Sequence, residues 1–159
     1  MDILLYESGD GGEMSLQGGD IQTTSAIFNY VYLSLFGGNV EASTPDVDPP
    51  RGVERQDYWA NVYSQSEPEN LFNSEYERII SNIVINTGTL QLISEAAKAD
   101  LSWMEELSLA VIEEVTTYLE AVGRTKTIIK LREPSNNEAS AFAVIWDATK
   151  SEAIVEAVI

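Results

Sequence analysis

The sequence predicts an α+β fold, and three stretches of the chain carry that prediction. Residues 26–36 are apolar, have large side chains near helical spacing, and are followed by two glycines. Residues 90–107 carry a second apolar stripe at helical spacing. Residues 125–131 instead alternate polar and apolar side chains, which is typical of a half-buried strand. Helices therefore precede a sheet along the chain.

The first region, residues 1–38, is expected to hold a small hairpin and one helix. Residues 3–6 form a short apolar strand candidate, a glycine-rich turn follows, and residues 14–17 can pair back. Residues 23–25 supply hydroxyl groups that can cap the helix over residues 26–36. The helix is expected to face the core.

The second region, residues 39–59, is expected to be an extended, partner-facing loop. It contains three prolines, mixed charge and little apolar content. Unstructured loops of this length usually serve a partner or are mobile. Tyr58 and Trp59 follow at its end, and two large aromatic side chains need burial either in this chain or in another.

The third region, residues 60–147, is expected to contain a helical pair and a three-stranded antiparallel meander. Ser74 is placed to cap a helix that runs from Glu75 to about Ile85, and a second helix follows over residues 90–107.

The strands of the meander are predicted from β-branched content and turn residues. Residues 110–122 are rich in Val, Ile and Thr, so a strand is favoured over a continued helix, and Gly123 marks a hairpin turn. Residues 139–146 supply the third strand and carry no charge, so we expect this strand to be the less protected edge. The apolar tail, residues 148–159, is expected to face a partner.

The amino-acid composition limits the kinds of catalytic or metal site that the chain can form. The chain has no histidine and no cysteine, which excludes a Cys–His site, a Ser–His–Asp triad and a Cys/His zinc site. With 26 acidic and 9 basic residues its net charge is −17, which disfavours binding to nucleic acid and to anionic membranes. We therefore expect no enzymatic activity, no cofactor and no bound metal.

Paired carboxylates were weighed as catalytic candidates. Glu105 and Glu106 are adjacent, as are Glu113 and Glu114, and adjacent residues on a helix do not face each other. A glycosidase needs two carboxyl groups across a cleft, one of them with a raised pKa. A small carboxylate-dependent hydrolase of lysozyme-like type stays an alternative, as does an acidic adaptor or inhibitor protein.

Five short blocks, in their order and spacing, resemble the baseplate protein family typified by gene product 46 of phage Mu. The family typically shows a turn, a helix end, an Arg-rich block and a second helix end before its strands. This chain departs from it at Gln56 and Tyr58, and Glu105-Glu106-Leu107 stands where related families carry Glu-Pro-Arg. The blocks are Met1-Asp2-Ile3, Gly18-Gly19-Asp20-Ile21, Tyr32-Leu33-Ser34-Leu35-Phe36, Arg55-Gln56-Asp57-Tyr58-Trp59 and Asp100-Leu101-Ser102-Trp103-Met104.

This resemblance implies a structural protein of a contractile tail, similar to the gene 25 type of sheath initiator. It implies a wedge protein of the virion tail baseplate, synthesised in the host cytoplasm and present in multiple copies, about six per baseplate. The implied partners are other wedge proteins, the tail sheath protein, and the tail tube or hub. The residues expected at the partner interface are Arg55, Tyr58, Trp59, Ile128, Phe142, Val144, Trp146, Ile154, Val155 and Val158.

Overall fold

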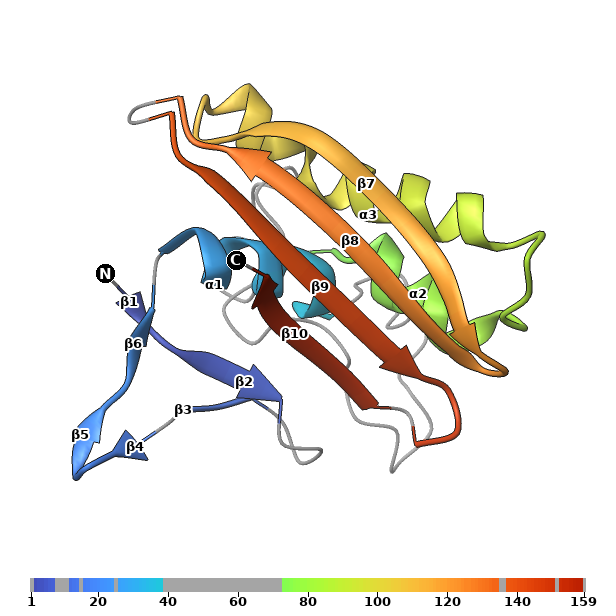
Figure 1. The fold of residues 1–159 in the computed structure, drawn as a ribbon, viewed down its shortest axis with the longest axis horizontal. Coiled ribbons are helices and arrows are strands. Elements are labelled where there is room, and N and C mark those ends of the chain that lie inside the picture. Colours follow the sequence, from blue (N-terminus) through green and yellow to red (C-terminus); the bar gives the residue numbers. More distant parts are fainter. Residues whose placement is uncertain are drawn as a thin grey trace, which may run out of the picture.

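The computed structural model describes residues 2–7, 12–14, 16–24, 26–38, 73–134, 137–150 and 152–158. Within these residues, the main body is a four-stranded antiparallel sheet with three helices against one face (Figure 1). Short amino-terminal strands form an arm beside the sheet (Figure 1). The chain therefore has the α+β architecture that the sequence predicts.

The sheet follows chain order, with each strand antiparallel to the next. Its strands are β7 (Val111–Ala121), β8 (Arg124–Arg132), β9 (Ala139–Asp147) and β10 (Glu152–Val158). β10 pairs with β9 along its whole length. The three-stranded meander that we expected is therefore four-stranded, because the apolar segment after the third strand folds back onto it.

The hairpin between β7 and β8 confirms the prediction made at Gly123. Ala121 stands opposite Arg124, so Val122 and Gly123 form a two-residue turn. Gly123 has a φ of 74°, which favours glycine because it lacks a Cβ atom. The chain does not continue as a helix before this hairpin, because Ser108 adopts a φ of 56° and reverses the backbone just after the preceding helix.

Alternate residues of the sheet point toward the helices and form the core. Ile129 stands opposite Phe142, and both side chains are buried. Thr127 stands opposite Val144 in the same way. The helices contribute the other half of this core, with Val31, Leu35, Tyr76, Ile80, Ile93, Leu101 and Met104 almost fully buried.

The three helices are α1 (Ala26–Phe36), α2 (Glu75–Asn82) and α3 (Leu90–Glu106). Ser74 caps α2 as predicted, since its hydroxyl accepts a hydrogen bond of 3.0 Å from the backbone N–H of Glu77. α2 ends earlier than expected. The backbone at Ile83 is already extended, and a run of β-branched residues follows it.

Buried hydroxyl groups form a chain of hydrogen bonds that links α2, the sheet and α3. The Tyr76 hydroxyl lies 3.1 Å from Thr127 Oγ1, which lies 2.9 Å from Thr117 Oγ1, which in turn accepts from Ser94 Oγ at 3.0 Å. Burial raises the pKa of the Tyr76 hydroxyl, which therefore stays protonated. α1 and α3 are joined where Trp103 Nε1 donates to Ser34 Oγ at 2.9 Å.

The amino-terminal arm consists of three short antiparallel pairs. β2 (Leu5–Glu7) pairs with β3 (Gly12–Met14), and Leu5 stands opposite Met14, which places a hairpin in the region where one was expected. The remaining pairs are β1 (Asp2–Ile3) with β6 (Thr23–Thr24) and β4 (Leu16–Gln17) with β5 (Asp20–Ile21).

Candidate functional site

The face of the sheet that points away from the helices is here called the outer face. It carries both polar and apolar side chains from all four strands. By the strand registers, its central residues are Glu114, Thr116 and Tyr118 of β7, Lys126, Ile128 and Lys130 of β8, Ala141, Ala143 and Ile145 of β9, and Ile154, Glu156 and Val158 of β10.

The β7–β8 half of the outer face is a row of ion pairs. Lys130 Nζ lies 2.7 Å from Glu114 Oε2, and Arg132 pairs with Glu113. Arg124 Nε lies 2.7 Å from Glu120 Oε2 at the hairpin end, as a close ion contact without hydrogen-bond geometry. The acidic side chains of β7 therefore form ion pairs with basic side chains of β8.

The pairing of Glu114 with Lys130 shifts their two pKa values in opposite directions. The hydrogen bond from Lys130 holds the pKa of Glu114 below its usual range, helped by the Thr116 hydroxyl, and the same bond raises the pKa of Lys130. Both side chains are exposed to solvent, so the pair contributes little to stability.

The β7 edge of the sheet is blocked by side chains from α3. The backbone N–H of Thr117 points away from β8 and donates to Ser94 Oγ at 2.9 Å. The backbone N–H of Ile112 donates to Glu105 Oε1, also at 2.9 Å. These donors would otherwise be available to a foreign strand. The α3 helix therefore protects this edge.

The β10 edge is different. In the described part of the chain β10 pairs only with β9, and β2 lies close to it without joining the sheet (Figure 1). Ile154 and Val158 are each 42% exposed on the outer face, and Glu156 is exposed between them. Among the described residues, β10 is therefore an edge strand that pairs on one side and carries partly exposed apolar side chains.

The ten residues expected at a partner interface divide into four groups, the last of which belongs to β9. Ile154 and Val158 lie on the outer face of β10, while Val155 is half-buried against the core. Ile128 is half-buried on the outer face of β8, between Thr116 and Ala143. Arg55, Tyr58 and Trp59, with the rest of the expected loop over residues 39–59, lie outside the described residues.

The expectation that residues 139–146 form an exposed edge is wrong. β9 is an inner strand, with β8 on one side and β10 on the other. Its large side chains are core residues: Phe142 is 2% exposed, Val144 is fully buried and Trp146 is 7% exposed. These three side chains are buried, so they are not available to a partner of the folded chain.

Asp100 was not singled out from the sequence, and it has an unusual environment. It lies on α3, and its carboxylate accepts hydrogen bonds from the backbone N–H groups of Glu75 and Tyr76 at 3.0 and 2.8 Å. Ser74 Oγ lies 3.1 Å from it and also donates to the carbonyl of Leu35 at 2.7 Å. Burial raises the pKa of Asp100 to about 6, against the lowering effect of the hydrogen bonds.

This arrangement makes Asp100 a structural cap that fastens α3 to the start of α2 and the end of α1. Both of its oxygen atoms are engaged by the helix terminus, as expected for an acid at the positive end of a helix. Among the described residues, no group of acidic side chains has the arrangement needed to hold a metal ion. None of the described helices is long and apolar enough to cross a membrane.

Comparison with family models, curated proteins and solved structures found no match to this chain. The functional argument therefore depends on the geometry of the sheet.

The sequence pattern does not reveal the role of Ser94 and Glu105 at the β7 edge. On α3 both are polar positions that flank the apolar stripe, as is common on an amphipathic helix. Their role depends on α3 lying along the edge of β7, which only the tertiary structure shows.

Proposed function

We propose that this chain is a structural component of a contractile-tail baseplate. It acts as a wedge protein that links the baseplate to the tail sheath and initiates sheath assembly by exchange of β-strands. The observation that carries this proposal is the β10 edge, which in the described part of the chain pairs with β9 alone and leaves Ile154 and Val158 partly exposed. A strand from a sheath subunit or a neighbouring wedge protein adds there through main-chain hydrogen bonds.

The blocked β7 edge supports the same proposal. Because Ser94 and Glu105 occupy backbone donors of β7, an incoming strand has one favourable place on each copy of the chain. A protein with a single open edge takes up one strand and does not extend into a chain of paired sheets. This is suited to a ring in which about six copies each receive one strand around the tail tube.

The proposal is tested by electron cryomicroscopy of the assembled particle. We expect a foreign strand within hydrogen-bonding distance of β10 in each copy. If no foreign strand pairs with β10 in the baseplate, strand exchange is contradicted and only the wedge role remains. If the chain is absent from the particle, both roles are contradicted.

A pair of variants tests the edge biochemically. Ile154→Asp combined with Val158→Asp places charge beside the incoming strand, and we expect incorporation into particles to fall at least about tenfold. The matched control is Leu92→Asp on α3, whose side chain is 46% exposed and lies away from β10. Equal loss of incorporation in both variants would contradict a specific role for β10.

A further inference from the structure

Glu156 differs from the acids on the opposite side of the outer face. On β7, the carboxylates of Glu113, Glu114 and Glu120 each pair with a cation from β8. Glu156 stands opposite Ala143, and no ion pair joins it to the described part of the chain. An acid on the sheet without a basic neighbour is therefore found only at the open edge, among the outer-face positions described.

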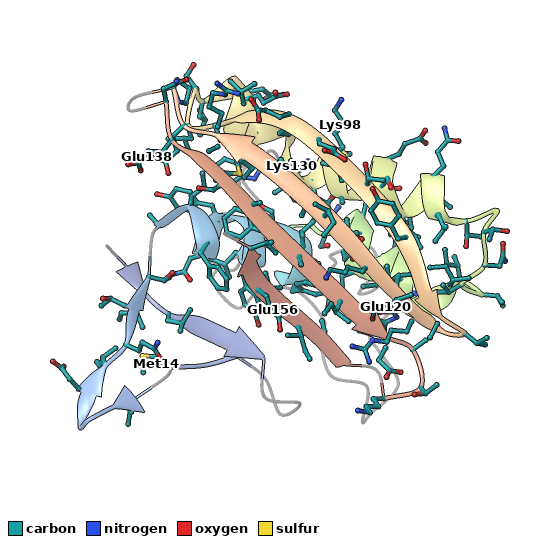
Figure 2. All side chains as sticks on the ribbon, viewed as in Figure 1. Met14, Lys98, Glu120, Lys130, Glu138 and Glu156 are labelled. Carbon is teal, nitrogen blue, oxygen red and sulfur yellow. The ribbon has the colours of Figure 1, made fainter. Side chains whose placement is uncertain are left out.

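The cations of β8 are too far away to serve Glu156. β9 lies between them, so the separation is two strand spacings, about 10 Å. Figure 2 shows Lys130 on β8 and Glu156 on β10 with β9 between them. Lys130 is in any case already paired with Glu114. A cation that faces Glu156 at close range has to come from the other side of β10.

The neighbours of Glu156 on β10 determine which other side chains an added strand would meet. Ile154 and Val158 flank it two residues away on the same face, and both remain partly exposed. Side chains directly opposite on adjacent antiparallel strands lie about 5 Å apart, so an added strand would place three side chains against these three. The two outer ones meet apolar surface and the middle one meets a carboxylate.

We infer that the strand received by β10 carries a lysine or arginine facing Glu156, between two apolar residues facing Ile154 and Val158. This inference depends on the strand pairing proposed above and adds the chemistry of the partner. The partner is then a basic–apolar segment of another protein, which also suits the net charge of −17 on this chain.

A second copy of this chain fits the edge poorly. Antiparallel pairing of β10 with β10 about Glu156 sets two glutamates directly opposite, and pairing about Ile154 sets Glu156 opposite Glu152. Every register also brings together two chains that each carry a net charge of −17. A basic strand from another protein avoids both the opposed glutamates and the repulsion between two acidic chains.

The test uses the whole chain, labelled with nitrogen-15, and three capped seven-residue peptides. The peptides share alternating Thr and Val and differ only at the central outward position, which is Lys, Gln or Glu. Binding is followed through the backbone amide signals of β10. A fourth peptide, the Lys form with alternate backbone nitrogens methylated, lacks the donors needed for pairing and serves as the control for main-chain bonding.

We expect the Lys peptide to bind about threefold to tenfold more tightly than the Glu peptide, with the Gln peptide between them. The preference should shrink in 1 M salt, and it should reverse in Glu156→Lys. Glu156 is exposed, so this variant should keep the circular dichroism spectrum and urea midpoint of the original chain.

The other outcomes separate the inference from the proposed function. Equal binding of the Lys, Gln and Glu peptides overturns the inference but leaves strand pairing at β10 intact. If no peptide shifts β10, or if the methylated peptide binds as well as its parent, both fail. Concentration-dependent dimerisation through β10 in sedimentation experiments also overturns the inference, because the occupant is then a second copy.

Discussion

The two edge strands of the sheet differ in how their outward-facing backbone groups are protected. At β7, two backbone donors bond to side chains of α3, namely Ser94 and Glu105. At β10, no described strand pairs with the outer side, and Ile154 and Val158 stay partly exposed. The difference shows that edge protection need not lie in the strand itself, because a helix packed along β7 supplies it.

The largest expected effect tests whether β9 is an inner strand and β10 an edge. Phe142→Ala should lower the free energy of unfolding by about 3–5 kcal/mol, because the ring is buried and packs against Phe28. Ile154→Ala, a matched truncation on the exposed edge, should cost less than about 1 kcal/mol. Urea denaturation measures both. Similar costs for the two variants would mean that β10 is buried in the free chain.

The next prediction concerns variants that remove the protection of the β7 edge. Ser94→Ala leaves the N–H of Thr117 without its acceptor, so we expect a loss of about 1–3 kcal/mol in the free energy of unfolding. The double variant with Glu105→Ala frees both donors, so its loss should be larger than that of either single variant. Urea denaturation measures these losses. Ser102→Ala, an exposed change on the same helix, is the control and should change the free energy of unfolding by less than about 0.5 kcal/mol.

A third prediction concerns how firmly α3 is held. The pKa of Asp100 rises from 3.8 to about 6 on folding, so the folded chain binds a proton more tightly than the unfolded chain does. Stability from this group is present below pH 4 and is lost as the pH rises through about 6.

Asp100→Asn removes this titration and serves as the reference. The stability difference between the original chain and the variant should be about 1 kcal/mol larger at pH 5 than at pH 7.5, since the general effect of net charge is nearly common to both. Urea midpoints at the two pH values measure it. A difference that does not change with pH would show that Asp100 stays ionised.

The smallest effect concerns the ion pairs on the outer face. Lys130→Met breaks the pair with Glu114, and because both groups are exposed we expect no resolvable change in the thermal midpoint. Strand pairing at β10 should also be unchanged, since β9 separates Lys130 from that edge. A clear loss of peptide binding in this variant would mean that the two halves of the outer face act together.

Local signals in the sequence predicted much of the main body. The cap at Ser74, the helix over residues 90–107 and the turn at Gly123 each depend on residues close together in the chain, and each is present. The fourth strand was not predicted because apolar residues occur on both faces of residues 152–158, so no strict alternation marks them as a strand. Their pairing with β9 also placed the open edge at β10, which local pattern does not determine.

The chain of hydroxyl groups from Tyr76 through Thr127 and Thr117 to Ser94 has a consequence for folding. The hairpin of β7 and β8 is a local structure and can form early, in more than one alignment of its strands. Only the native alignment places Thr117 opposite Thr127 where both helices can reach them. A slip of one residue would turn these hydroxyls outward and bring lysines into the core. We therefore expect α2 and α3 to dock stably only onto a hairpin whose strands are in the native alignment.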